Sequence, residues 1–384
     1  MKLLDWILFA VMAVNISYLL IFALAARFAK PRPRLKATIQ RTMAVLIPAY
    51  KEDAVIEECV QACLNQDYPS DRFTVAVIAD HMKPETNERL RRLPITLIEA
   101  DYENSTKSKA LNLAMSRLPD HDIAIVFDAD NTVGSDFLSR INQAFEYGDV
   151  QLLQAHRVAK NLNNHMAVLD AVSEETNNSI FRQGHYAIGL SSALIGSGMA
   201  FDYLIFKEKM KSIVAIGGFD RNLELSFLKE GKRIHYLSDA LVYDEKVQNK
   251  QAFSNQRRRW LSAQVHYMLE FGKDFFPALL KGKVDFCVKY LQQLAIPRVV
   301  LLGFTLLCAL LMTLFAPLAA PKWWWLSGLL FLAFALAIPP QLFDRRLMRA
   351  LIMLPGVFWL MVRNLFMLKG ANKHFIHTQH GVNR

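Results

Sequence analysis

The stretch DIAIVFDAD, residues 122–130, joins an apolar run to two aspartates that are separated by one residue. Continuous apolar runs of this length are typical of strands that are buried on both faces of a parallel sheet. Similar runs lie upstream at residues 43–50 (MAVLIPAY), 73–80 (FTVAVIAD) and 95–100 (ITLIEA), and segments with helical spacing separate them. Strands that alternate with helices predict an α/β domain with helices on both faces of the sheet.

Polar side chains collect where these strands end. Tyr50 and Glu52 follow the first strand, Asp80 ends the second, and Asp128 and Asp130 close the stretch 122–130. Ligands of open α/β sheets bind beyond the carboxyl ends of the strands. In an extended segment residues i and i+2 point the same way, so Asp128 and Asp130 are predicted to present two carboxylates to one hard cation. We expect this cation to be Mg²⁺ or Mn²⁺.

The sequence also limits what such a cation holds. It contains neither G-x-x-x-x-G-K-[ST] nor a G-x-G-x-x-G after the first strand, which excludes a P-loop and a dinucleotide fingerprint. The metal-bridged diphosphate of a nucleotide-sugar fits better, because the cation then stabilises the charge on the leaving diphosphate. Lys107 and Lys109 either add positive charge near the same oxygens or form an ordinary solvated helix start.

Apolar segments at both ends of the chain predict an integral membrane protein. A helix needs ~20 mostly apolar residues to cross a bilayer. Residues 3–26, 299–320 and 323–340 satisfy this, whereas 351–368 contains Pro355 and Arg363 and is interpreted as interfacial. The first segment is too long for the ~7–15-residue apolar core of a signal peptide and has its basic residues behind it, so we expect an uncleaved anchor.

The positive-inside rule then gives the topology. The basic flank at residues 27–41 stays in the cytosol, together with the domain at 42–260. The remaining segments are expected to be interfacial amphipathic helices at 261–295, two transmembrane helices at 296–342, and an interfacial helix with a cytosolic tail at 343–384. The net charge of +10 is explained by basic residues at the membrane edges, so nucleic-acid binding is not expected. The four cysteines lack zinc-site spacing and are expected to be reduced and buried.

Seven motifs occur in an order that resembles membrane-bound family 2 glycosyltransferases. They are VLIPAYKE, VIAD, KSKALN, FDAD, GSGMAF, GGFDRNLEL and QRRRW, between Met43 and Trp260. That family includes exopolysaccharide, hyaluronan and cellulose synthases and ceramide glucosyltransferases. The resemblance implies a nucleotide-sugar-binding fold of the GT-A type. It also implies transfer of a hexosyl or N-acetylhexosaminyl group, with inversion.

The resemblance also implies roles for individual residues. The donor would contact Tyr50, Glu52, Asp80, Lys107, Asp128, Gln256 and Arg259. The acceptor would contact Gly196, Ser197, Gly198 and Trp260, and the metal would lie on Asp128 and Asp130. An arginine fork suits phosphate oxygens, and a flat indole suits the apolar face of a sugar. Arg257 and Arg258 are assigned to anionic lipid headgroups, and His374, His377 and His380 to a tail packed near the active site.

One departure from the family concerns the general base. Aligned on "LEL" (residues 223–225), the usual Glu-Asp pair falls on Arg221 and Asn222, and an amide does not accept a proton at neutral pH. Asp220 and Glu224 flank this position. We expect Glu224 to take over the base role, with Asp220 as the alternative.

The sequence therefore predicts a glycosyltransferase of a bacterial inner membrane, with its catalytic domain in the cytosol. Its donor is expected to be a UDP-sugar and its acceptor a growing polysaccharide or a lipid-linked glycan. Membrane lipids, a homo-oligomer or an export partner are the other expected partners. Two alternatives stay open: a ceramide- or polyprenyl-type lipid glycosyltransferase that adds one sugar, and a pseudoenzyme that binds nucleotide-sugar.

Overall fold

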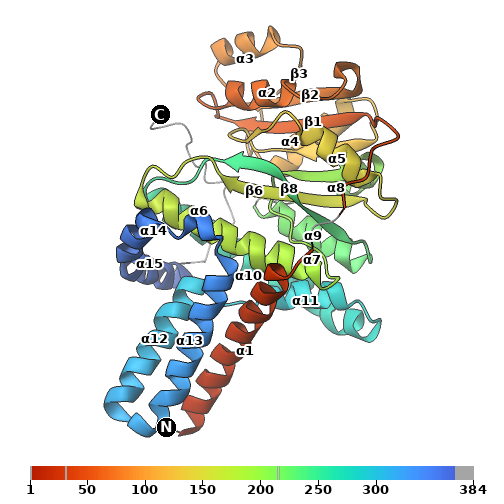
Figure 1. Ribbon diagram of the computed structural model, residues 1–384. Helices are drawn as coiled ribbons and strands as arrows, with labels where there is room; N and C mark the ends of the chain where they lie inside the picture. Colours follow the sequence, from red (N-terminus) through yellow and green to blue (C-terminus); the bar gives the residue numbers. More distant parts are fainter. Residues whose placement is uncertain (1, 31–32, 214, 216, 368–384) are drawn as a thin grey trace.

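A mixed eight-stranded sheet forms the centre of the upper part of the molecule (Figure 1). The computed structural model describes residues 2–30, 33–213, 215 and 217–367. The strand order is β3-β2-β1-β4-β7-β6-β8-β5. The strands are β1 (Met43–Tyr50), β2 (Phe73–Asp80), β3 (Thr96–Ala100), β4 (Ile123–Val126), β5 (Thr132–Val133), β6 (Leu152–Ala159), β7 (Met199–Asp202) and β8 (Ile234–Asp244).

The parallel half of the sheet confirms the predicted alternation of strands and helices. Strands β3, β2, β1 and β4 are parallel neighbours, and Tyr50 pairs with Asp80 in the register of β1 and β2. The stretch 122–130 differs in one respect, because β4 ends at Val126 and a turn follows, with Asn131 N donating to Asp128 O at 3.1 Å. The explanation of the two aspartates by an extended segment is therefore wrong, and their approach depends on a turn.

Helices cover both faces of the sheet, as the alternation predicts. One face packs on α4 (Lys107–Arg117), α8 (Tyr203–Ser212) and α9 (Phe219–Lys229). The other face packs on α2 (Ile56–Leu64), α3 (Pro84–Arg91) and α5 (Phe137–Phe145). Short 3₁₀ turns lie at η1 (Ser70–Arg72), η3 (Pro317–Ala319), η4 (Pro340–Leu342) and η5 (Leu351–Met353).

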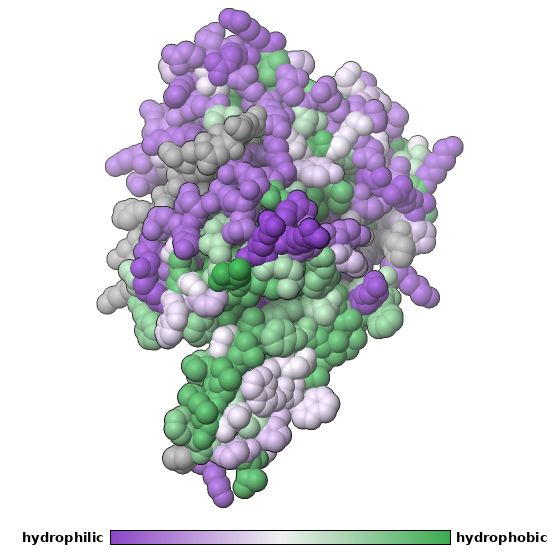
Figure 2. Space-filling view, turned by 60° about the vertical axis from the view of Figure 1, so that its left-hand side comes forward, coloured by the Kyte–Doolittle hydropathy of each residue, from purple (hydrophilic) through white to green (hydrophobic). Residues whose placement is uncertain are grey.

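Three long apolar helices form a bundle below this domain (Figure 1). They are α1 (Lys2–Arg27), α12 (Arg298–Phe315) and α13 (Ala320–Ala337). The space-filling view shows a largely hydrophobic surface over the bundle and a hydrophilic one over the sheet domain (Figure 2). By length and composition, four segments among the described residues are apolar enough to cross a bilayer, at 2–27, 298–315, 317–337 and 345–366. These helices indicate membrane association.

The last of these four segments is broken and lies apart from the long axis of the bundle (Figure 1). It consists of α14 (Arg345–Ala350), η5 and α15 (Leu354–Phe366). Helix α14 packs on α6 (His165–Asn177), and α15 packs on both α10 (Lys250–Leu280) and α12. The interfacial position of this segment stays a prediction. The three tail histidines lie outside the described residues.

Helix α10 crosses the expected domain boundary at residue 260 without a break. Tyr267 and Phe271 of α10 and Phe286 of α11 (Val284–Gln292) are buried in the same core as α4 and α9. Residues 261–295 thus contribute to the core of the sheet domain. They also expose apolar side chains such as Leu280 and Phe276.

A π-helix joins the sheet domain to the bundle. This element, η2 (Asn178–Gly184), continues α6 and is followed by α7 (His185–Ala187). It packs on α1 so closely that a Cβ on Gly184 would lie 2.1 Å from the carbonyl oxygen of Phe22. Glycine has no Cβ and therefore permits this close approach of η2 to α1.

Candidate functional site

A cavity of about 380 Å³ opens beyond the carboxyl ends of β1, β2 and β4. Its size lies in the range of small-molecule sites. Tyr50 and Asp80, which end β1 and β2, and Glu52, which follows β1, line this cavity. His81 Nδ1 donates to Asp80 Oδ1 at 2.6 Å and so orients that carboxylate.

Three carboxylates converge in the cavity wall. Asp128, Asp130 and Asp244 each place an oxygen within 4.8 Å of the others. Asn131 supports the group, because its Nδ2 donates to Asp130 Oδ1 at 3.3 Å and to Asp244 Oδ1 at 3.2 Å. Burial opposes ionisation of Asp244, but Lys246 and Arg157 outweigh it and hold the pKa of that carboxyl below its usual range. Three carboxylate oxygen donors fit Mg²⁺ or Mn²⁺.

Asp244 is absent from the residues predicted from sequence. It ends β8, which pairs with β6 and lies far along the chain from residues 128–130. Asp244 ends the apolar run 240–244, just as Asp80 and Asp128 end or follow apolar runs. The same sequence signal could therefore have identified Asp244.

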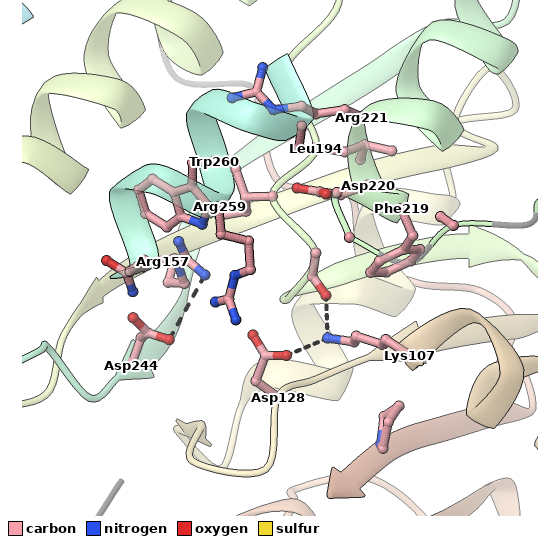
Figure 3. Close-up of a pocket in the computed structure, with 18 of the residues that line it drawn as sticks. Lys107, Asp128, Arg157, Leu194, Phe219, Asp220, Arg221, Asp244, Arg259 and Trp260 are labelled. Atoms are coloured by element: carbon pink, nitrogen blue, oxygen red, sulfur yellow. Dashed lines mark hydrogen bonds and ion pairs between the residues drawn. The ribbon is translucent and has the colours of Figure 1, made fainter. Parts of the chain in front are cut away.

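Positive charge faces this acidic wall (Figure 3). Lys107 Nζ contacts Asp128 and donates to the carbonyl oxygen of Gly196 at 2.7 Å. The Arg259 guanidinium extends from α10 toward Asp128 (Figure 3). Burial lowers the pKa of Arg259, and Asp128 and Asp220 oppose this shift. Lys109 instead donates to Asn104 O at 2.8 Å and is exposed, which supports the view of it as an ordinary helix-start lysine.

The glycine-rich loop has a conformation that other residues disfavour. Gly196 and Gly198 have φ of +84° and +62°, and a Cβ on Gly198 would lie 2.9 Å from Val242 Cγ2. Gly196 lines the cavity, whereas Ser197 is fully buried and bonded to Asn131 behind it. The loop therefore shapes the cavity through Gly196, while Ser197 and Gly198 support it from behind.

Helix α9 presents Asp220 and Glu224 to the cavity but not Asn222. The first two lie one turn apart and both line the cavity. Asn222 Oδ1 accepts from Ser226 at 3.1 Å, and its side chain borders a separate surface pocket. Burial raises the pKa of Asp220, while Arg221 and Lys107 lower it. Asp220 lies beside the Gly196 loop, since a Cβ on Gly196 would be 3.8 Å from Asp220 Oδ2.

Glu224 has different surroundings from Asp220. It is 3% exposed, and its Oε1 lies 3.8 Å from Nζ of the fully buried Lys289. Burial raises the pKa of Glu224 to about 7, although Lys289 and Arg221 lower it. Burial likewise lowers the pKa of Lys289 to about 8.

The segment QRRRW divides its side chains between the cavity and the core. Gln256, Arg259 and Trp260 line the cavity, as expected. The assignment of Arg257 to lipid headgroups is wrong, because this side chain is buried and forms an ion pair with Asp170. Its guanidinium also lies 4.4 Å from the centroid of Trp260. Arg257 thus stacks on the indole that lines the cavity.

The model of the glycosyltransferase-like family 2 matches residues 40–263 of this chain. The chain belongs to glycosyltransferase family 2. Among its relatives, beta-monoglucosyldiacylglycerol synthase of Nostoc sp. is 26% identical over 280 residues, which are 69% of this chain and 57% of that protein. Glucomannan 4-beta-mannosyltransferase 7 of Arabidopsis thaliana is 24% identical over 241 residues, which are 56% and 41% of the two chains. The match thus spans little more than half of the Nostoc relative.

A solved structure shares the fold of this family 2 glycosyltransferase. Mannosyltransferase PcManGT from Pyrobaculum calidifontis, in complex with GDP-Man and Mn²⁺, superposes with a TM-score of 0.57 at 18% identity. The superposition covers 94% of this chain and 96% of that one. It confirms a GT-A-like sheet combined with long apolar helices.

The glycosyltransferase also contains a buried ionic network that sequence reasoning missed. Glu174 Oε2 accepts from Arg157 at 3.1 Å, and Glu174 Oε1 lies 2.9 Å from Arg182 Nη1. Burial opposes the charge on Glu174, but the two arginines and Lys246 keep its pKa well below the usual range. The network connects the acidic wall to η2 and hence to α1.

Proposed function

We propose that this glycosyltransferase transfers a hexose or N-acetylhexosamine from a UDP-sugar to a hydroxyl of a lipid-linked acceptor, with inversion. The observation that carries the proposal is the arrangement of charge in the cavity. Asp128, Asp130 and Asp244 cluster in the cavity wall, Lys107 contacts Asp128, Arg259 extends toward Asp128, and Asp220 lines the same cavity. This is the arrangement that departure of a diphosphate from an anomeric carbon requires.

The donor would bind with its nucleoside against Tyr50 and Asp80 and its diphosphate between Lys107 and Arg259. The three aspartates would hold Mg²⁺ or Mn²⁺, which when bound neutralises charge on the diphosphate. An arginine fork and a lysine supply fixed positive charge for the same oxygens. The bond from C1 to the diphosphate breaks, and its electron pair goes to a β-phosphate oxygen.

We propose Asp220 as the general base in place of Glu224. Asp220 lies beside the Gly196 loop and acts electrostatically on both Lys107 and Arg259, which would flank the reacting carbon. It would accept the proton of the acceptor hydroxyl while that oxygen attacks C1. Glu224 is paired with Lys289 instead. The pseudoenzyme hypothesis rested on Asn222 in place of the family's acid. If Asp220 supplies this acid, that reason for the hypothesis no longer applies.

A lipid-linked acceptor is supported by the position of the cavity above the helical bundle. The cavity wall includes Phe181 and Arg182 of η2, which packs on α1. The Nostoc relative is named as a glucosyldiacylglycerol synthase. We further propose that the sheet domain lies on the cytosolic side of a bacterial inner membrane, with α1, α12 and α13 spanning it.

The test is turnover of the purified full-length protein in detergent. A panel of UDP- and GDP-sugars with Mn²⁺ or Mg²⁺ is offered together with dioleoylglycerol, a glycolipid and a polyprenyl phosphate. We expect UDP release that requires both the cation and a lipid acceptor, and a product with one added sugar. A long polymer would favour the polysaccharide synthase instead. No turnover and no nucleotide-sugar binding would refute the proposal.

A further inference from the structure

Glu224 is a buried acid of the cavity that the proposed transfer does not use. Its Oε1 has no hydrogen-bond partner among the described residues, although the residue lines the cavity. A buried carboxylate oxygen without a hydrogen bond is costly. Lys289 compensates its charge at 3.8 Å but leaves the hydrogen bond unmade.

Lys289 is fixed by the π-helix that joins the domain to the bundle. Its Nζ donates to the carbonyl oxygen of Phe181 at 2.9 Å and to Gln292 Oε1 at 3.2 Å. The Phe181 ring lies 6.3 Å from that of Tyr18 on α1. The carbonyl and the lysine therefore hold Glu224 where the cavity wall meets the helices that indicate membrane association. π-helical turns occur frequently at functional sites.

The charges at this end of the cavity select the class of ligand. Arg182 is already paired with Glu174, and Arg221 is bonded to Gln293. Among the described residues, Glu224 Oε1 lacks a hydrogen bond, and a carboxylate oxygen accepts hydrogen bonds and repels anions. A hydroxyl donates to such an oxygen, whereas a phosphate would lie against a like charge.

We propose that Glu224 is an acceptor-specificity residue that binds a second hydroxyl of a neutral, glycerol- or sugar-type lipid headgroup. Lys289 is its positioning residue, and η2 sets the distance from this site to the membrane. The inference rests on the proposed function, since it assigns the acceptor class of the same cavity. Asp220 would then take the proton of the reacting hydroxyl, while Glu224 orients the headgroup.

The experiment compares Glu224→Gln with wild type in the full-length protein. The substitution keeps the volume of the side chain and removes the charge. With dioctanoylglycerol or octyl glucoside as acceptor, we expect KM for the acceptor to rise about tenfold or more, the usual effect of losing a charge-assisted hydrogen bond. We expect kcat at saturating acceptor to fall less than about threefold. Glu230→Gln, at the exposed end of the same helix, is the matched control and should change neither value.

Lys289→Met tests the positioning role through the same split between KM and kcat. It should reproduce the KM defect, and the double variant should be no worse than Lys289→Met alone, because the two residues act as one unit. Additive defects would overturn the positioning role. If Lys289→Met does not fold, the Glu224→Gln result decides the acceptor site by itself.

Other outcomes separate this inference from the proposed function. An unchanged acceptor KM in Glu224→Gln, or preferential use of farnesyl phosphate by the wild type, would overturn the acceptor site while leaving the glycosyltransferase intact. A collapse of kcat with unchanged KM would show that Glu224 acts on the reacting atoms. If the wild type turns over no donor, the proposed function fails, and binding of dioctanoylglycerol to the UDP- and Mn²⁺-loaded protein still tests Glu224: equal affinity in the variant refutes the site.

Discussion

Asp220→Asn is the substitution that tests the assignment of the general base. It exchanges one carboxylate oxygen for an amide nitrogen, so the volume at the start of α9 is unchanged. An amide does not accept a proton at neutral pH, and general-base catalysis contributes roughly 10²–10⁴-fold. We expect kcat to fall by about that factor. UDP binding should change little, because Asp128, Asp130 and Asp244 are untouched.

The assay measures initial rates of acceptor-dependent UDP release, together with the affinity for UDP in Mn²⁺. Asn222→Asp is the matched control: its side chain faces Ser226 and a separate pocket, so it should not raise turnover. The reasoning is refuted if Asp220→Asn keeps kcat within about threefold of wild type. A gain of turnover in Asn222→Asp would instead restore the original alignment of the family's acidic pair.

The same carboxylate predicts the acid limb of the pH profile. Burial raises the pKa of Asp220 above the usual 3.8, and the active form is the deprotonated one. The value of kcat/KM should therefore fall as the pH drops through this raised pKa, at a higher pH than an ordinary aspartate gives. Arg221→Gln removes a cation that lowers this pKa, so the limb should move further toward neutral pH. A limb that stays in place in Arg221→Gln would argue against Asp220.

Three further outcomes test the metal site, the core and the topology. Asp244→Asn should lower the Mn²⁺-dependent affinity for UDP by roughly tenfold or more. The exposed control Asp71→Asn should leave this affinity unchanged. Equal affinities in the two variants would show that Asp244 does not belong to the metal site. Arg257→Met leaves its buried partner carboxylate unpaired, and we expect it to lower the free energy of unfolding by about 3–5 kcal/mol, measured by thermal or denaturant unfolding, because removal of one partner of a buried ion pair has that cost. In intact cells, a cysteine at Leu318, between α12 and α13, should react with an impermeant thiol reagent, and one at Glu103 should not; the reverse pattern would invert the proposed topology.

The sequence by itself determined the elements and the end of the sheet at which chemistry takes place. Apolar runs that end in acid marked Asp80 and Asp128, and the polar edge followed from the rule that parallel strands place their carboxyl ends together. The apolar segments 3–26, 299–320 and 323–340 were visible because crossing a bilayer requires a long apolar run. These features depend on residues that are close together in the chain, so they can be recognised from the sequence alone.

Only the tertiary structure decided which residues face one another across the cavity. Asp244 joins Asp128 because β8 pairs with β5, which closely follows Asp130, and the local pattern does not encode this pairing. Asp220 faces the cavity and Asn222 does not, because the residue at which α9 begins sets which side of the helix is turned inward. The motif spacing had instead favoured Glu224, one turn further along this helix. Arg257 is buried because α6 supplies Asp170 from 87 residues upstream. Such contacts depend on the packing of distant segments, and packing is the property that a linear pattern of residues does not contain.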